Sequence, residues 1–180
     1  MAKVTVFGGA APKPGEAAYE EAYQLGKLLA SLGHVVINGG YIGTMEAVSR
    51  GASEAGGAVI GVTSDEIEKY RTGSPNPWIT QEERYPQLRQ RIMAMIDSSD
   101  AAIALPGGIG TLTEILTTWN HLLIGAIQSR PLILVGPEWQ SIISKFLEEL
   151  GEYIPASQRK WVQFAADVET AVKMLGDSHS

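Results

Sequence analysis

The segment 105–114, with the sequence LPGGIGTLTE, holds the residue types and spacing best suited to binding chemistry. Gly107, Gly108 and Gly110 follow an apolar run and precede apolar residues at helical spacing. Glycine leaves backbone N–H groups uncovered, so several of them at a helix N-terminus can point at one anion, and Thr111 adds a hydroxyl donor. The segment therefore predicts a phosphate-binding turn between a strand and a helix.

A second glycine cluster, 38–46 with the sequence NGGYIGTME, repeats this layout. Its candidate binding residues are Gly39, Gly40, Gly43 and Thr44. Two such turns suit a nucleotide that places its phosphate at one turn and its sugar near the other. Two ordinary strand-to-helix turns without a ligand are the alternative interpretation.

Two carboxylates stand in the first turns of the helices that follow these clusters. Glu114 comes three residues after Thr111, the spacing of a capping box, in which the glutamate accepts the N-cap amide. That structural role competes with a chemical one. Glu46 comes only two residues after Thr44, and a carboxylate so placed gains roughly 0.3–1 kcal/mol from the helix dipole. Glu46 is therefore a further candidate for the site.

One arginine borders an apolar helix face. In the expected helix 85–98 this face includes Leu88, Ile92 and Met95, and Arg91 lies beside it. A side chain in this position either extends along the apolar surface to solvent or binds a phosphate or carboxylate near the sheet edge. Both interpretations stay open on this pattern.

Short apolar runs alternate with amphipathic stretches along the chain. The expected strands are 4–7, 35–38, 58–62, 101–105, 132–135 and 162–164, and the expected helices are 16–32, 44–55, 85–98, 111–123, 139–150 and 168–175. This order is typical of a Rossmann-like α/β fold, a doubly wound parallel sheet with helices on both faces. All three glycine clusters, including the candidates Gly8 and Gly9, fall at carboxyl ends of strands, where such folds bind ligands. The segment 65–81 predicts a surface loop that shapes or covers the site.

Composition narrows the class of protein. The 180 residues predict a single domain, 1–180, and the lack of cysteine excludes disulfides, thiolate catalysis and cysteine-ligated metals. His34, His121 and His179 show no ligand spacing, so no metal site is expected. The net charge of −6, with scattered basic residues, argues against a nucleic-acid surface. Without a signal segment or an apolar run of membrane-spanning length, we expect a cytoplasmic protein.

With the motif PGGIGTLTE and Arg91 eight residues before Ser99, the chain resembles the Lonely Guy family, whose members were long mislabelled as lysine decarboxylases. The resemblance covers nearly the whole chain. It implies a Rossmann-like homodimer that hydrolyses cytokinin riboside 5′-monophosphates to free base and ribose 5-phosphate, and it implies no cofactor. Decarboxylation would need a lysine that carries pyridoxal phosphate, and no lysine lies in the glycine clusters.

The resemblance also implies roles for individual residues. Arg91 and Glu114 would be the catalytic pair. The 5′-phosphate would be bound by Gly107, Gly108, Gly110 and Thr111. When an N-glycosidic bond breaks, the ribose gains oxocarbenium character. A nearby carboxylate stabilises this positive charge or orients the attacking water.

The chain departs from the family pattern at several positions. The family usually has glycine where Asn38 and Glu46 stand, a lysine where Ile92 stands, and hydroxyl residues in place of Ala10 and Ala11. These differences concern the substrate more than the fold. A non-catalytic carrier or sensor of a phosphorylated ligand, such as a nucleotide or molybdenum cofactor, is the alternative function.

Overall fold

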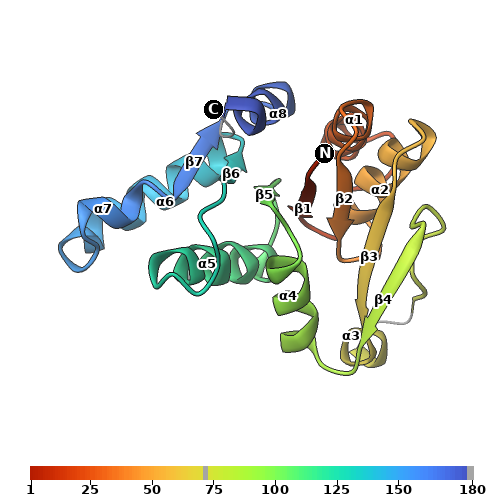
Figure 1. Ribbon diagram of the computed structural model, residues 1–180, viewed down its shortest axis with the longest axis horizontal. Helices are drawn as coiled ribbons and strands as arrows, with labels where there is room; N and C mark the ends of the chain where they lie inside the picture. Colours follow the sequence, from red (N-terminus) through yellow and green to blue (C-terminus); the bar gives the residue numbers. More distant parts are fainter. Residues whose placement is uncertain (71–72, 178–180) are drawn as a thin grey trace.

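The computed structural model describes residues 1–70 and 73–177 (Figure 1). Seven parallel strands form one sheet in the order β4-β3-β2-β1-β5-β6-β7. The strands are β1 (Lys3–Phe7), β2 (Val35–Asn38), β3 (Val59–Ser64), β4 (Gln81–Tyr85), β5 (Ala101–Ala104), β6 (Leu132–Val135) and β7 (Val162–Ala165). The expected doubly wound parallel sheet is confirmed.

Helices cover both faces of this sheet. The helices are α1 (Ala17–Ser31), α2 (Thr44–Glu54), α3 (Asp65–Tyr70), α4 (Leu88–Asp97), α5 (Ile109–Leu123), α6 (Pro137–Leu150), the 3₁₀ helix η1 (Gly151–Tyr153), α7 (Ala156–Arg159) and α8 (Val168–Asp177). Buried residues of α1, α2 and α8 share one apolar cluster, and those of α4, α5 and α6 share the other. In Figure 1, α1 lies above β1 and β2, and α4 and α5 lie below β5.

The central strands are buried on both faces, as is usual for a parallel sheet between helices. In β5, Ala101 and Ile103 belong to the cluster under α1, α2 and α8, whereas Ala102 and Ala104 belong to the cluster under α4 and α5. Strand side chains alternate between faces, so one short apolar run fills both cores. This explains why β5 has a continuous apolar sequence.

The sheet order reverses between β1 and β5. From β1 the chain adds β2, β3 and β4 on one side, then returns to place β5 on the other side, followed by β6 and β7. The loops after β1 and β5 therefore leave the sheet in opposite directions and open a crevice at their carboxyl ends. The turns at Gly8 and Gly107 both lie at this position.

The structure differs from the expected elements between residues 65 and 98. The segment expected as a loop begins with α3, and β4 was not predicted, because its sequence QEERY is charged and lacks apolar alternation. It is an edge strand, and such strands are exposed. Helix α4 begins at Leu88 rather than residue 85, because Pro86 disfavours a helical conformation at Tyr85.

Two of the three histidines fall in the described residues. The Nδ1 atom of His34 accepts the backbone N–H of Ala2 at 3.2 Å, and Nδ1 of His121 lies 2.7 Å from the carbonyl oxygen of Thr117. His179 lies outside the described residues. Within residues 1–70 and 73–177, every helix is too short or too polar to cross a lipid bilayer.

Candidate active site

The three glycine clusters meet at the switch point of the sheet. The N–H of Gly9, after β1, donates to the carbonyl oxygen of Pro106, after β5, at 3.1 Å. The carbonyl oxygen of Gly9 accepts the N–H of Thr44, the first residue of α2, at 2.9 Å. Gly9 thereby joins the turns that precede α1, α2 and α5.

Close packing explains why glycine is needed at particular positions in these turns. A Cβ atom on Gly107 would overlap Oγ1 of Thr111 and lie 2.8 Å from the backbone nitrogen of Gly9. A Cβ atom on Gly8 would overlap the methyl group of Thr44. Gly43 has a φ of +71° and packs against the backbone of Ala10. The turns therefore lie closer together than side chains would allow.

Helix α5 presents its N-terminus to this site. The helix begins at Ile109 with Gly108 as its N-cap, and its first intrahelical bond joins the N–H of Leu112 to the carbonyl oxygen of Gly108. The N–H groups at 109–111 precede that bond and are suited to an anion. The capping box expected at Thr111 is wrong, because Thr111 lies inside the helix rather than at its N-cap.

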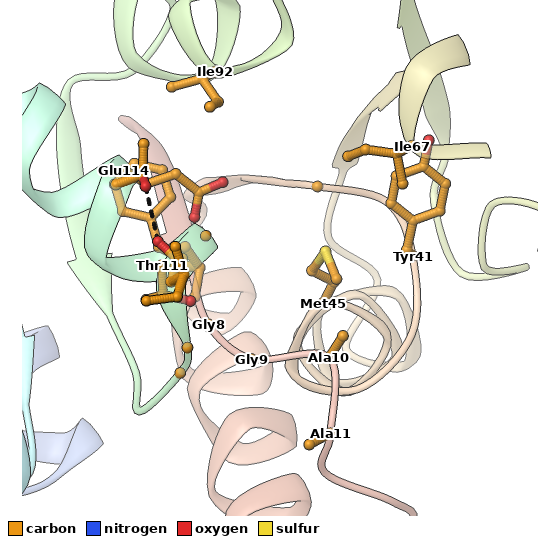
Figure 2. Close-up of a pocket in the computed structure, with 18 of the residues that line it drawn as sticks. Gly8, Gly9, Ala10, Ala11, Tyr41, Met45, Ile67, Ile92, Thr111 and Glu114 are labelled. Atoms are coloured by element: carbon orange, nitrogen blue, oxygen red, sulfur yellow. Dashed lines mark hydrogen bonds between the residues drawn. The ribbon is translucent and has the colours of Figure 1, made fainter. Parts of the chain in front are cut away.

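The site is a cavity of about 840 Å³. Figure 2 shows Thr111 and Glu114 on one side of it, Tyr41, Met45 and Ile67 on the opposite side, and the loop of Gly8 to Ala11 beneath. The predicted site residues on its wall are Gly8, Gly9, Gly39, Arg91, Gly107, Gly108, Gly110, Thr111 and Glu114. The cavity therefore brings together residues from all three clusters and from α4.

A buried ion pair occupies the wall of the cavity. Nη1 of Arg91, on α4, lies 3.6 Å from Oε1 of Glu114, on α5, and the two residues are only 5% and 8% exposed. Nε of Arg91 donates to the carbonyl oxygen of Val62, on β3, at 2.7 Å. Of the two interpretations left open for Arg91, the structure supports a buried contact with a carboxylate.

Burial dominates the ionisation of this pair. It raises the pKa of Glu114 to about 7, although the neighbouring Arg91 guanidinium acts in the opposite direction. Burial also lowers the pKa of Arg91, an effect that Glu114 and Tyr41 counteract. A carboxyl group with a pKa near neutrality accepts and releases a proton readily at physiological pH, which suits acid–base chemistry.

Four predicted candidates lie outside the cavity wall. Gly40, Gly43 and Thr44 shape the β2–α2 turn, and Gly40 has a φ of +76° with its carbonyl oxygen bound to the N–H of Asn76. Oε1 of Glu46 lies 3.4 Å from the hydroxyl of Tyr19, on α1. Of the second cluster, Gly39 alone among the predicted candidates reaches the described cavity wall.

Sequence reasoning missed several residues that line the cavity. Tyr41 and Met45 belong to the second glycine cluster, and Ile67 and Tyr70 lie on α3, inside the expected loop. Tyr41 stands between two glycines in the sequence, but its partners lie far away in the chain. The sequence predicts that the segment 65–81 shapes or covers the site, and Ile67 and Tyr70 of this segment line the cavity. The sequence pattern did not indicate these two residues individually.

The fold and the cavity define a Rossmann-like α/β protein with a cavity at its topological switch point. A family model described as the SLOG cluster4 family matches residues 1–161. The chain is 29% identical over 178 residues to a cytokinin riboside 5′-monophosphate phosphoribohydrolase of Rhodococcoides fascians, covering 96% of this chain and 88% of the relative. It is 31% identical over 183 residues to the Arabidopsis thaliana cytokinin riboside 5′-monophosphate phosphoribohydrolase LOG1, covering 97% and 83%.

These matches establish the family. The chain belongs to the Lonely Guy (LOG) family, as a member of SLOG cluster4. Among solved structures, the molybdenum cofactor binding protein of Rippkaea orientalis has a TM-score of 0.77 and 25% identity, and the match covers 99% of this chain and 97% of that one. The LOG fold thus occurs both in relatives named as hydrolases and in a protein named for cofactor binding.

Proposed function

We propose that this protein hydrolyses the N-glycosidic bond of a nucleoside 5′-monophosphate, releasing free base and ribose 5-phosphate. The observation that carries the proposal is the buried Glu114–Arg91 pair, in the same cavity wall as the N-terminus of α5. Relatives that match at 29% and 31% identity over most of the chain are named phosphoribohydrolases, which supports the same reaction class.

The 5′-phosphate binds at the β5–α5 turn in this proposal. Gly107, Gly108 and Gly110 are exposed to the cavity and carry no side chain, and the N–H groups of the first helical turn are directed to the helix N-terminus. The helix dipole adds a favourable interaction with the phosphate charge. Thr111, buried against Gly107, supplies a hydroxyl group at the same point.

Glu114 acts on the ribose. Its ionised carboxylate stabilises the positive charge that develops as the bond between C1′ and the base nitrogen breaks. Water supplies the oxygen that bonds to C1′, and the base leaves with the bonding electrons and takes up a proton. Arg91 orients Glu114 and the sugar. A carboxyl with a pKa of about 7 gains activity as the pH rises through neutrality, because the ionised form is the active one.

The base lies against the wall formed by α3 and α4 in this proposal. Ile67 and Tyr70 from α3 and Leu88 and Ile92 from α4 line the cavity with apolar atoms. Such a surface favours a base that carries an apolar substituent, as an N6-modified adenine does. The identity of the base is the part of the proposal that a substrate panel decides.

The test is a panel of nucleoside 5′-monophosphates, including AMP and N6-modified AMP, with chromatographic measurement of free base and ribose 5-phosphate. Wild-type protein should release both products in equal amounts from at least one member. Glu114→Gln should abolish release while nucleotide binding is retained. Glu138→Gln, the same change at an exposed carboxylate in the first turn of α6, is the matched control and should keep full turnover.

A non-catalytic carrier or sensor is the second candidate, favoured by the match to a molybdenum cofactor binding protein. This function predicts saturable binding of a phosphorylated ligand and a raised Tm without any product. At a ligand concentration of 100 times Kd, binding stabilises the fold by about 2.7 kcal/mol. Stabilisation by one nucleotide, with no base released from any member of the panel, would favour the carrier and contradict the hydrolase.

A further inference from the structure

Tyr41 connects the cavity wall to the end of strand β3. Its side chain lines the cavity, and its ring centroid lies 5.8 Å from Cζ of Arg91. Its hydroxyl accepts the N–H of Ser64 at 2.8 Å, and the carbonyl oxygen of the same residue lies 3.1 Å away as an acceptor. The ring is therefore fixed at its hydroxyl end by the backbone of β3, with its face near the guanidinium.

The guanidinium of Arg91 lies in a slot built from separate parts of the chain. On one side its Nε donates to the carbonyl oxygen of Val62, two residues before Ser64 on the same strand. On another side the backbone of Gly39 approaches so closely that a Cβ atom there would overlap Nη2. Strand β3 thus holds Arg91 twice, directly through Val62 and through the anchored ring of Tyr41.

We propose that Tyr41 is a positioning residue that holds the Arg91 guanidinium beside Glu114. The face of an aromatic ring attracts a cation, and this attraction is stronger where water is excluded. A buried guanidinium whose carboxylate partner is 3.6 Å away needs such further contacts to stay in place. The effect on turnover rests on the proposed function, whereas the effect on the ion pair does not.

The charged and titratable groups around this cluster define the expected response. Arg91 faces Glu114 from α4, and Tyr41 faces Arg91 from the β2–α2 turn. Oε1 of Glu68, on α3, lies 3.4 Å from the Tyr41 hydroxyl, and Arg84, on β4, holds Glu68 at 2.6 Å. Arg91 lowers the pKa of Glu114, so a displaced guanidinium lets that pKa rise.

The direct test is a ¹³C NMR titration of the Glu114 carboxyl group, with its resonance assigned by the Glu114→Gln variant. Tyr41→Leu removes the ring and should raise the titration midpoint by about 1 pH unit. Tyr41→Phe keeps the ring but removes its anchor to Ser64, so its midpoint should lie between those of the wild type and Tyr41→Leu. Tyr23→Leu is the matched control, because it removes a ring 5.8 Å from Arg50, outside the cavity, and should leave the midpoint unchanged.

The same variants test the effect on catalysis. Tyr41→Leu should lower kcat about tenfold and move the acid limb of the pH profile upward with the NMR midpoint. An unmoved midpoint in a folded Tyr41→Leu protein, judged by circular dichroism, would overturn the positioning role. A rise in KM alone would also overturn it.

Two other outcomes still allow the positioning role of Tyr41 to be decided. If Tyr41→Leu does not fold, Tyr41→Met, with a longer apolar side chain, replaces it under the same expectations. If the wild type cleaves no nucleotide, the proposed function fails, but the NMR midpoint still decides whether Tyr41 positions Arg91.

Discussion

At Glu114, burial of the side chain in the folded protein opposes ionisation of its carboxyl group. A carboxylate removed from water loses hydration that a single arginine 3.6 Å away does not fully replace. The raised pKa is the consequence, and it makes the folded state sensitive to pH. A chain selected for stability alone would gain from an apolar residue here, so the buried carboxyl itself supports a functional role.

The stability of the wild type should fall with rising pH because of Glu114. Its folded-state pKa of about 7 lies above the ordinary value of 4.5, so the folded protein binds more protons than the unfolded chain between these values. Its stabilising contribution is complete below pH 4.5 and is lost as the pH rises through about 7. Relative to Glu114→Gln, the wild type should lose roughly 3 kcal/mol between pH 4.5 and 7.5 in urea unfolding.

The Glu138→Gln variant reports what the same substitution does at an exposed position. A wild type whose stability changes with pH in parallel with that of Glu114→Gln would contradict the burial effect. This measurement needs no ligand, so its outcome is independent of the proposed activity.

The β5–α5 turn contains glycines with different surroundings, some closely packed and some facing open space. Gly107 is packed against Thr111 and Gly9, whereas a Cβ built on Gly110 has no atom within 4 Å beyond its chain neighbours and the backbone of its own helix. Both glycines look alike in the sequence motif. Their surroundings in the folded protein indicate that the first is required by packing and the second only by the space in front of the helix.

Substituting each glycine with alanine should separate these roles. Gly107→Ala should destabilise the protein by about 1–3 kcal/mol, because its methyl group overlaps the buried Thr111 side chain and the backbone of Gly9. Gly110→Ala, near the start of helix α5, should stabilise it by about 0.5–1 kcal/mol, because alanine loses less entropy in a helix. Urea unfolding measures both effects.

Binding measurements complete the comparison. If the phosphate occupies the helix N-terminus, Gly110→Ala should weaken nucleotide binding at least tenfold by calorimetry while its stability rises. Unchanged affinity in Gly110→Ala would move the phosphate away from this turn.

At the scale of the whole molecule, sheet order decides where the site forms. Gly9 and Gly107 lie far apart in the sequence and come together because β1 and β5 are neighbours in the sheet. Arg91 joins the same cavity wall from α4, which packs beside β3. The outer surface also has apolar side chains that one chain leaves exposed. On α6 these are Ile142, Phe146 and Leu150, spaced four residues apart and 37–50% exposed.

We propose that two chains associate, as the resemblance to the Lonely Guy family implies, and the exposed apolar side chains of α6 offer a first place to test for the contact. Sedimentation equilibrium should give twice the 19.3 kDa of one chain. The double variant Ile142→Lys with Phe146→Lys should weaken association, because burying the lysine charges costs free energy. Leu32→Lys, at an exposed position after α1, is the control. A monomeric wild type would contradict the proposal.

The sequence by itself determined the alternation of strands and helices, the parallel sheet and the three glycine turns at strand ends. These depend on local patterns, since continuous apolar runs and helical spacing are readable within short windows. The same reasoning failed at β4, whose charged sequence forms an edge strand only because β3 offers backbone partners. It also assigned Glu114 a competing capping role that the position of the helix start excludes.

Only the tertiary structure decided which of the candidate residues share one cavity. Arg91 is buried because α4 packs beside β3, and Tyr41 reaches it from a separate turn. Likewise, the pKa of Glu114 depends on how completely the folded chain excludes water from its carboxyl group, and no spacing in the sequence reports that exclusion. Contacts between distant segments, and the exclusion of water from them, depend on how the whole chain packs. Local sequence patterns therefore indicate candidate residues, and the tertiary structure determines which of them lie together.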